Sequence, residues 1–237
     1  MPKQKPEPSL ALHQKKMMAQ LGKTHNDLGL LPGTLVMPTG ARLPGLFKHP
    51  SRRAKLEWLR LKARVRDFAT VLMYKWGIVK GKKPRPKIEF GMIKTAARNL
   101  HHEMYAALAE GDKAALGKIC ANGLLDSFNL KINNRGTHEK YKWTAERYIG
   151  QPKVVSHRVA ALSKPMPNES SLRQAVVRIR SRQVLEKVNR RGKKEEVSAK
   201  DMDEYLVIQK LMVEGREGDW VVWGTTHETD PNTLLDD

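Results

Sequence analysis

The sequence contains very little cysteine and no long run of apolar residues. Cys120 is the single cysteine among 237 residues, so the chain cannot form an internal disulfide or a cysteine-rich metal site. This composition is typical of a protein from a reducing compartment. No apolar run reaches the roughly 18 residues that a membrane-spanning helix needs. Any contact with a membrane is therefore expected to be peripheral.

Acidic residues are scarce in the first part of the chain. Residues 1–90 contain 20 Lys and Arg but only five Asp and Glu, a net charge of +15. Residues 91–237 contain 24 Lys and Arg against 20 Asp and Glu, a net charge of +4. Together they give a net charge of +19 and a pI near 10.1. Such an excess predicts an anionic partner, either a nucleic acid or an acidic lipid surface, that contacts mainly the first 90 residues.

The sequence also lacks the motifs of common catalytic and metal sites. It has no glycine-rich phosphate loop, no nucleophile elbow and no paired acidic motif. His101 and His102 have no further histidine at ligand spacing, so we interpret them as a surface or helix-boundary pair. His157 falls within a predicted strand and is interpreted as a core histidine, and Cys120 as a small buried residue. We therefore expect a protein with no catalytic activity, metal, cofactor or small-molecule substrate.

Residues 1–50 are expected to form an extended basic arm. Pro2, Pro6 and Pro8 disfavour an early helix, and the segment has too few apolar residues to offset the entropy of ordering it alone. Further on, Pro-Gly pairs alternate with apolar residues, which indicates an extended segment that lies along a surface. We expect the arm to become ordered only in an assembly.

Residues 51–76 are predicted to form a long amphipathic helix. Ser51 is a suitable N-cap and Gly77 a suitable stop, and apolar residues recur every three or four positions. We predict that this apolar stripe faces the protein core, and that the Trp residues of the chain are mostly core residues. Trp76, at the helix end beside a basic loop, is also compatible with an interface. The stripe consists of Ala54, Trp58, Leu61, Val65, Phe68, Leu72 and Trp76.

The rest of this helix is strongly cationic. Glu57 and Asp67 are its only acids, so its basic residues repel one another unless an anionic surface meets them. A proline-stiffened basic loop at residues 80–87 completes a basic segment over residues 51–89 and offers further contacts to phosphate groups. The candidate nucleic-acid-binding residues are Arg52, Arg53, Arg60, Lys62, Arg64, Arg66, Lys80, Lys82, Lys83, Arg85 and Lys87.

Residues 90–227 are predicted to form an α+β domain. Amphipathic periodicity predicts a long helix from Phe90, and Asp112 is a suitable cap for a second, short helix. From Lys140 the apolar period changes to two, which predicts a series of antiparallel strands. Helices followed by such strands indicate helices packed on one face of an antiparallel sheet. Residues 228–237 form an acidic tail.

Two parts of the sequence resemble a known family. Its N-terminal motifs are similar to the start of the family of the mitochondrial large-ribosomal-subunit protein forty-five and its fungal relative, the inner-membrane ribosome receptor. Residues 90–226 resemble the domain that this family shares with the import-motor anchor of the inner membrane. The N-terminal motifs are LPGT at 31–34, PTG at 38–40, LP at 43–44 and WLRLK at 58–62.

The resemblance implies two or three helices on a curved antiparallel sheet, related to the nuclear-transport-factor-two cone. It implies a non-enzymatic component of the mitochondrial large ribosomal subunit near the tunnel exit, which binds mitochondrial rRNA and tethers the ribosome to the inner membrane for co-translational insertion. The implied partners also include neighbouring large-subunit proteins, inner-membrane lipids and the insertase. The implied location is the mitochondrial matrix, peripheral to the inner membrane.

Two other interpretations stay open. The first is a peripheral inner-membrane or import-motor adaptor that is not stably ribosomal. The second is an isomerase or dehydratase of the cone fold, for which His157 is the one candidate catalytic residue. Sedimentation of a mitochondrial lysate after treatment with high salt distinguishes a stable ribosomal protein from both.

If the resemblance holds, residues 90–226 should offer the membrane a basic surface. Arginines alternate with apolar residues along one predicted strand, and a basic loop follows it. Each Lys or Arg near an anionic lipid surface contributes about 1 kcal/mol to binding, so a cluster of them supports reversible attachment. The same arginine face is also compatible with rRNA or water. The candidate membrane-facing residues are Arg178, Arg180, Arg182, Arg190, Arg191, Lys193 and Lys194.

Overall fold

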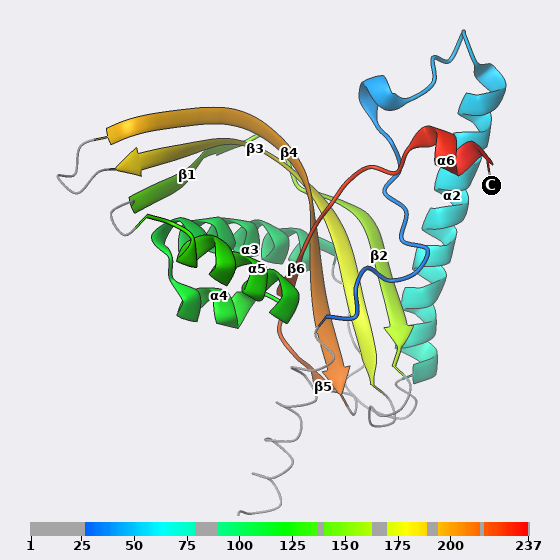
Figure 1. The fold of residues 1–237 in the computed structure, drawn as a ribbon. Helices are drawn as coiled ribbons and strands as arrows, with labels where there is room; N and C mark the ends of the chain where they lie inside the picture. Colours follow the sequence, from blue (N-terminus) through cyan, green and yellow to red (C-terminus); the bar gives the residue numbers. More distant parts are fainter. Residues whose placement is uncertain are drawn as a thin grey trace, which may run out of the picture.

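A computed structural model shows an α+β arrangement of helices around one strongly curved sheet (Figure 1). It describes residues 27–78, 90–136, 140–162, 170–188, 194–213 and 216–236. The helices are η1 (Gly40–Arg42), α2 (Pro50–Met73), the π-helical turn η2 (Tyr74–Ile78), α3 (Phe90–Glu110), α4 (Lys113–Ile119), α5 (Asn122–Asn133) and α6 (Pro231–Asp236). The strands are β1 (Lys140–Tyr148), β2 (Lys153–Ala161), β3 (Ser171–Val188), β4 (Lys194–Val213), β5 (Arg216–Glu217) and β6 (Val221–Thr226).

Two long central strands hold the antiparallel sheet together. β3 is 18 residues long and pairs with β4 from one end to the other. β2 pairs with the first half of β3 and β1 with its second half, whereas β5 and β6 pair with the second half of β4. The sheet therefore has a β1 half and a β2 half that share the same two strands.

Helices α3, α4 and α5 fill the concave side of the sheet (Figure 1). Alternate residues of β3 point toward them, because successive side chains of a strand lie on opposite faces. Val177 and Ile179 of β3 pack there with Ile93 and Leu116 of the helices. The predicted cap is confirmed, since the Asp112 carboxylate accepts hydrogen bonds from two backbone N–H groups of α4 at 2.9 Å. These elements confirm the predicted fold class.

An extended segment at residues 27–39 covers the opposite face of the β2 half. Val36 packs there against Val176 and Val207, which alternate with the residues that face the helices. The backbone N–H of Leu31 donates to Gln174 Oε1 at 2.9 Å. The segment therefore completes a second, smaller core.

The expectation that residues 1–50 become ordered only in an assembly is thus wrong for residues 27–39. The prediction considered only the apolar residues of the arm itself. It missed that the sheet offers these residues a ready apolar surface, which lowers the entropic cost of placing them. Residues 1–26 lie outside the described part of the chain.

Helix α2 covers the open edge of the sheet at β2, beside which it runs in Figure 1. The Asp67 carboxylate accepts hydrogen bonds from Ser156 Oγ at 2.6 Å and from the backbone N–H of His157. The Thr70 hydroxyl accepts a hydrogen bond from the backbone N–H of Val159 at 3.3 Å. Both side chains satisfy N–H groups that an uncovered edge strand would leave without a protein partner. The helices thus do not all lie on one face of the sheet.

The face of α2 that packs on the protein is not the predicted apolar stripe. Leu56 and Val71 are 1% and 2% exposed, and Tyr74 is buried on the same side. Trp58 and Trp76 are instead 65% and 56% exposed. At about 100° per residue, the predicted stripe lies on the side of the helix opposite Leu56. The predictions that the stripe faces the core and that Trp58 is a core residue are both wrong. Of the two positions considered for Trp76, the structure excludes the core.

The physical reason lies in how α2 is held. Asp67 and Thr70 accept hydrogen bonds from the edge strand and so attach α2 to it, and the docked face therefore needs few apolar residues. Apolar periodicity identifies a face that avoids water, but it does not tell which partner covers that face.

The predicted tail also packs on α2. Leu234 of α6 is buried against Leu56 and Met37. The 27–39 segment, α2 and α6 therefore pack together on the β2 side of the sheet.

Candidate functional surfaces

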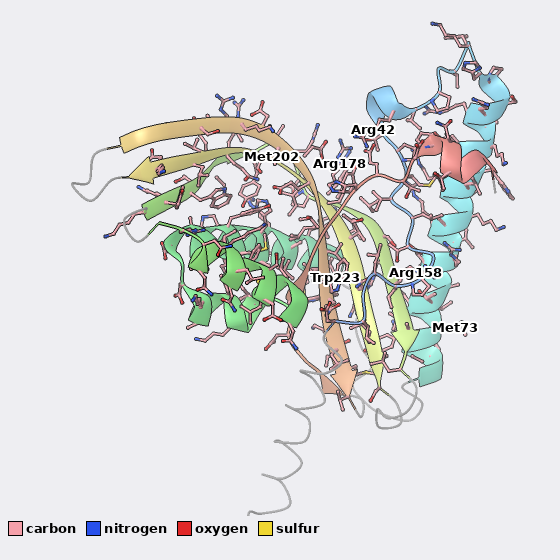
Figure 2. All side chains as sticks on the ribbon, in the orientation of Figure 1. Arg42, Met73, Arg158, Arg178, Met202 and Trp223 are labelled. Carbon is pink, nitrogen blue, oxygen red and sulfur yellow. The ribbon has the colours of Figure 1, made fainter. Side chains whose placement is uncertain are left out.

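The three predicted membrane-facing arginines of β3 lie on the face of the sheet that points away from α3. Arg178 donates to the Asp203 carboxylate through two nitrogens, and Figure 2 shows it where the long strands bend. Arg182 pairs with Glu146 at 2.8 Å and with Asp201 at 3.4 Å. Acids from β1 and β4 thus neutralise two of the three charges.

Arg180 is exposed on the same face. Arg190, Arg191 and Lys193 lie outside the described residues. Lys194 is the first residue of β4, opposite Val188. Of these seven residues, the structure therefore places only Arg178, Arg180 and Arg182 together on one surface. Their role at a membrane stays a prediction.

Three of the predicted nucleic-acid-binding residues of α2 already have partners within the protein. Arg53 and Arg60 both pair with Glu57, at 3.0 and 2.8 Å. Arg60 also donates to a backbone carbonyl of the 27–39 segment at 2.9 Å, and Arg66 donates to another. These guanidinium groups are partly used within the protein and are less available to a partner.

The other predicted cations of α2 are open to a partner. Arg52, Lys62 and Arg64 are exposed and make no ion pair or hydrogen bond with other described residues. The predicted loop residues Lys80, Lys82, Lys83, Arg85 and Lys87 lie outside the described part of the chain.

Arg64 lines a cleft of about 460 Å³ between α2, β2 and the start of α3. Lys94 of α3 and Lys153 of β2 line it from the other sides. The acid in its lining, Asp67, is paired with Arg158 at 3.4 Å, and Figure 2 shows Arg158 between the sheet and α2. Burial raises the pKa of Asp67, while hydrogen bonding and Arg158 act in the opposite direction. The cleft thus combines three cations with an acid that is already bound.

A second cleft of about 380 Å³ adjoins the first at Lys94. Lys94, Arg98 and His102 recur every four residues along α3 and therefore lie on one face of it. No acid is among the residues that line this cleft. The guanidinium of Arg98 stacks on the Tyr148 ring, with 4.3 Å between its central carbon and the ring centroid. The two clefts share Lys94, and together they are called the cationic groove.

The sequence prediction missed the part of the groove outside α2. The spacing of Lys94, Arg98 and His102 was a usable signal. Lys153 was not predictable in this role, because only the fold brings β2 next to α2.

A buried polar cluster lies beneath the sheet, on the side of α3. His101 is 0% exposed, and its Nε2 lies 3.0 Å from Glu204 Oε2. Tyr105 and Gln183 donate to the same carboxylate. Burial alone would raise the pKa of Glu204, but the hydrogen bonds from these three groups outweigh it and lower the pKa. The interpretation of His101 and His102 as a surface pair is therefore wrong for His101, which faces the core.

An apolar cavity of about 340 Å³ opens beside this cluster. Its wall includes Trp143 stacked on Tyr105, with 5.3 Å between ring centroids, and Leu185. Arg135 lines the cavity and stacks on the Tyr141 ring. His101 is fully buried, and neither His101 nor Glu204 is among the residues that line the cavity.

A comparison with protein-family models matches residues 36–237 to the MBA1-like protein family. The chain belongs to this family. MBA1-like proteins are mitochondrial and membrane-associated. The match includes α2 and α6 as well as the sheet, and it begins within the 27–39 segment. No curated protein gives a significant match.

Two further residues of this MBA1-like protein agree with the sequence predictions. His157 is buried, and the Nε of Arg173 donates to its Nε2 at 2.8 Å. Burial and the charge of Arg173 lower the pKa of His157 to about 3, so the ring is neutral at neutral pH. Cys120 is also buried, which raises the pKa of its thiol to about 12.

Two absences apply to the described residues of the MBA1-like protein. None of their helices is both long enough and apolar enough to cross a membrane. No group of three or more His, Cys, Asp or Glu among them is arranged to hold a metal ion.

Proposed function

We propose that this protein is a structural component of the mitochondrial large ribosomal subunit near the tunnel exit. It binds rRNA and helps to hold the ribosome at the inner membrane during co-translational insertion. It has no enzymatic activity and needs no cofactor. Its location is the mitochondrial matrix, peripheral to the inner membrane, next to large-subunit proteins and the insertase.

The observation that carries the rRNA part of the proposal is the cationic groove. Arg64, Lys94 and Lys153 come from three different elements and converge on one cleft whose acid is already bound. Cations that converge without matching acids repel one another, and an RNA backbone removes that repulsion through its phosphates. The excess of positive charge in residues 1–90 supports the same partner.

The groove favours contacts to the phosphate backbone over contacts to particular bases. Its charged groups are at the ends of long side chains, and phosphate contacts give affinity and position without sequence information. Arg98 on Tyr148 adds a planar cation next to the groove. The sequence also predicts phosphate contacts by Arg52 of α2 and by the loop at residues 80–87, which lies outside the described part of the chain.

The test is the salt dependence of binding to purified mitochondrial large subunits. In the variant Arg64→Gln, Lys94→Gln and Lys153→Gln, each lost phosphate contact should reduce the slope of log K against log salt by about 0.7 to 0.9. The three changes together should lower the slope by about 2 to 3. Co-sedimentation over a series of salt concentrations measures it.

The matched control carries Lys118→Gln, Lys142→Gln and Lys200→Gln, three substitutions of exposed lysines outside the groove. The control has the same net charge as the groove variant. An equal slope for control and groove variant would mean that only net charge matters and would contradict a binding groove. A protein that does not co-sediment with the subunit even at low salt would instead favour the interpretation as a membrane adaptor.

A further inference from the structure

Helix α2 exposes an apolar stripe that the described residues leave uncovered. Seven of the 14 large apolar side chains exposed in the described part of the chain lie on α2 and the turn after it. Apolar residues exposed singly are normal in proteins, but a contiguous group marks an interaction surface. The exposed stripe consists of Trp58, Leu61, Val65, Phe68, Leu72 and Trp76.

The shape of the exposed stripe is long, narrow and straight. Its residues follow one another at intervals of three or four, so they lie along one line of the helix. From Trp58 to Trp76 the line is about 27 Å long at 1.5 Å per residue. It lies opposite the docked residues Leu56 and Tyr74 and points away from the protein, except at its edge, where Phe68 also lines the cleft between α2, β2 and α3.

Cations flank the exposed stripe on both sides. Lys55, Lys62 and Arg66 lie along one flank, and Arg64 and Lys75 lie along the other, from the helical angle of each position. The acids of α2 do not interrupt this pattern. Glu57 is paired with Arg53 and Arg60, and Asp67 is bound to β2.

We propose that α2 lies in the plane of an anionic membrane surface, with the exposed stripe at the boundary between headgroups and acyl chains. A helix with an apolar face, Trp residues and flanking Lys and Arg is suited to that position. Lys62 and the other flanking cations then reach the lipid phosphates. This inference rests on the membrane part of the proposed function and names the surface that makes the contact.

Charge complementarity distinguishes the membrane from the other occupants of such a stripe. In a dimer of this chain, the stripes would bring Lys62 and Arg64 of both copies together, and the like charges would repel. An RNA backbone offers phosphates to the flanks, but it does not remove Leu61, Val65 and Phe68 from water. An anionic lipid surface satisfies both the flanks and the stripe.

The same comparison favours α2 over the arginine face of β3. Arg178 and Arg182 are matched by acids of β1 and β4, so that face attracts anionic lipids only weakly. The described residues that are exposed on the arginine face also do not include a row of large apolar side chains like the exposed stripe.

The test is flotation of the full chain with vesicles of phosphatidylcholine and cardiolipin. The stripe variant carries Leu61→Gln, Val65→Gln and Phe68→Gln, all at exposed positions, so its fold should be unchanged by circular dichroism and thermal unfolding. Loss of three apolar side chains from the lipid boundary should weaken vesicle binding about a hundredfold. The matched control carries Leu130→Gln, Leu185→Gln and Val197→Gln, which are also exposed, and should bind as the parent does.

A second measurement reports insertion directly. Lipids with brominated acyl chains quench Trp emission on contact, and Trp58 and Trp76 are the Trp residues of the exposed stripe. Quenching should occur in the parent and should disappear in the variant Trp58→Phe and Trp76→Phe. Quenching that persists in this variant would overturn the proposal.

The flotation outcomes separate this inference from the proposed function. Equal binding of stripe variant, control and parent would place the membrane contact elsewhere and overturn the inference, while the tethering role would remain. A parent that does not float would overturn both the inference and the membrane part of the role. A stripe variant that floats normally but no longer co-sediments with large subunits would assign the stripe to the ribosome and overturn the inference.

Discussion

His157 should make the stability of the protein depend on pH in a predictable direction. The ring is 4% exposed, and its Nε2 accepts a hydrogen bond from the guanidinium of Arg173. Protonation of the ring would remove that acceptor and place two cations together in the core. Burial and Arg173 therefore lower the pKa of His157 from 6.5 to about 3.

The direction of the pH dependence follows from the pKa of His157 in the unfolded and in the folded protein. In the unfolded chain His157 binds a proton with a pKa near 6.5, whereas in the folded protein it stays neutral down to about pH 3. The contribution of His157 to the free energy of unfolding is therefore fully present above pH 6.5, and it decreases as the pH falls below that value. Each pH unit in this window is equivalent to about 1.4 kcal/mol, so about 2 kcal/mol is lost between pH 7 and pH 5.

The assay compares the parent with His157→Gln, because other groups also titrate in this range. Gln has no charge change, and its side-chain oxygen can accept from Arg173. Urea unfolding, followed by Trp fluorescence at both pH values, gives the free energy of unfolding. The parent should lose about 2 kcal/mol more than the variant between pH 7 and pH 5. An equal loss in both proteins would refute the reasoning.

Two further predictions concern stability. Glu204→Leu leaves His101, Tyr105 and Gln183 without their shared acceptor, so it should cost about 3 kcal/mol in urea unfolding, whereas Glu146→Gln on the surface should change stability by less than about 0.5 kcal/mol. A small effect at Glu204 would mean that the cluster is hydrated. Leu56→Ala should cost about 2 to 4 kcal/mol, while Leu61→Ala should cost less than about 0.5 kcal/mol, because only Leu56 is buried. The opposite order would show that α2 docks through the exposed stripe after all.

The local elements were largely predictable from the sequence. Apolar periods of three to four and of two identify α3 and the strands, and Asp112 identifies the start of α4, because these signals lie within a few neighbouring residues. The orientation of α2 was not predictable in this way. It depends on hydrogen bonds that Asp67 and Thr70 accept from β2, a strand about 90 residues further along the chain.

The sequence contains a signal that both faces of the β2 half are covered, one of them by the 27–39 segment. The runs Ala175–Val176–Val177 and Leu206–Val207–Ile208 are apolar without alternation, which is typical of strands buried on both faces. The polar cluster left no comparable signal. Glu204 follows Asp201 and Asp203 in a stretch typical of a solvated strand, and only the fold brings it to His101.

The shared strands β3 and β4 have a mechanical consequence for the proposed link between the ribosome and the membrane. Helix α2 is attached to the β2 half, while α3 contacts mainly β1 in the other half. A pull between the two halves runs along the strands, at right angles to their hydrogen bonds. The hydrogen bonds of the β2–β3 ladder and of the β1–β3 ladder then each resist together in shear, instead of opening one after another as in a peeled hairpin, and the backbone of β3 carries the load between them. The protein is therefore stiff along its long strands, and its weak direction is the one that separates α2 from the edge of β2.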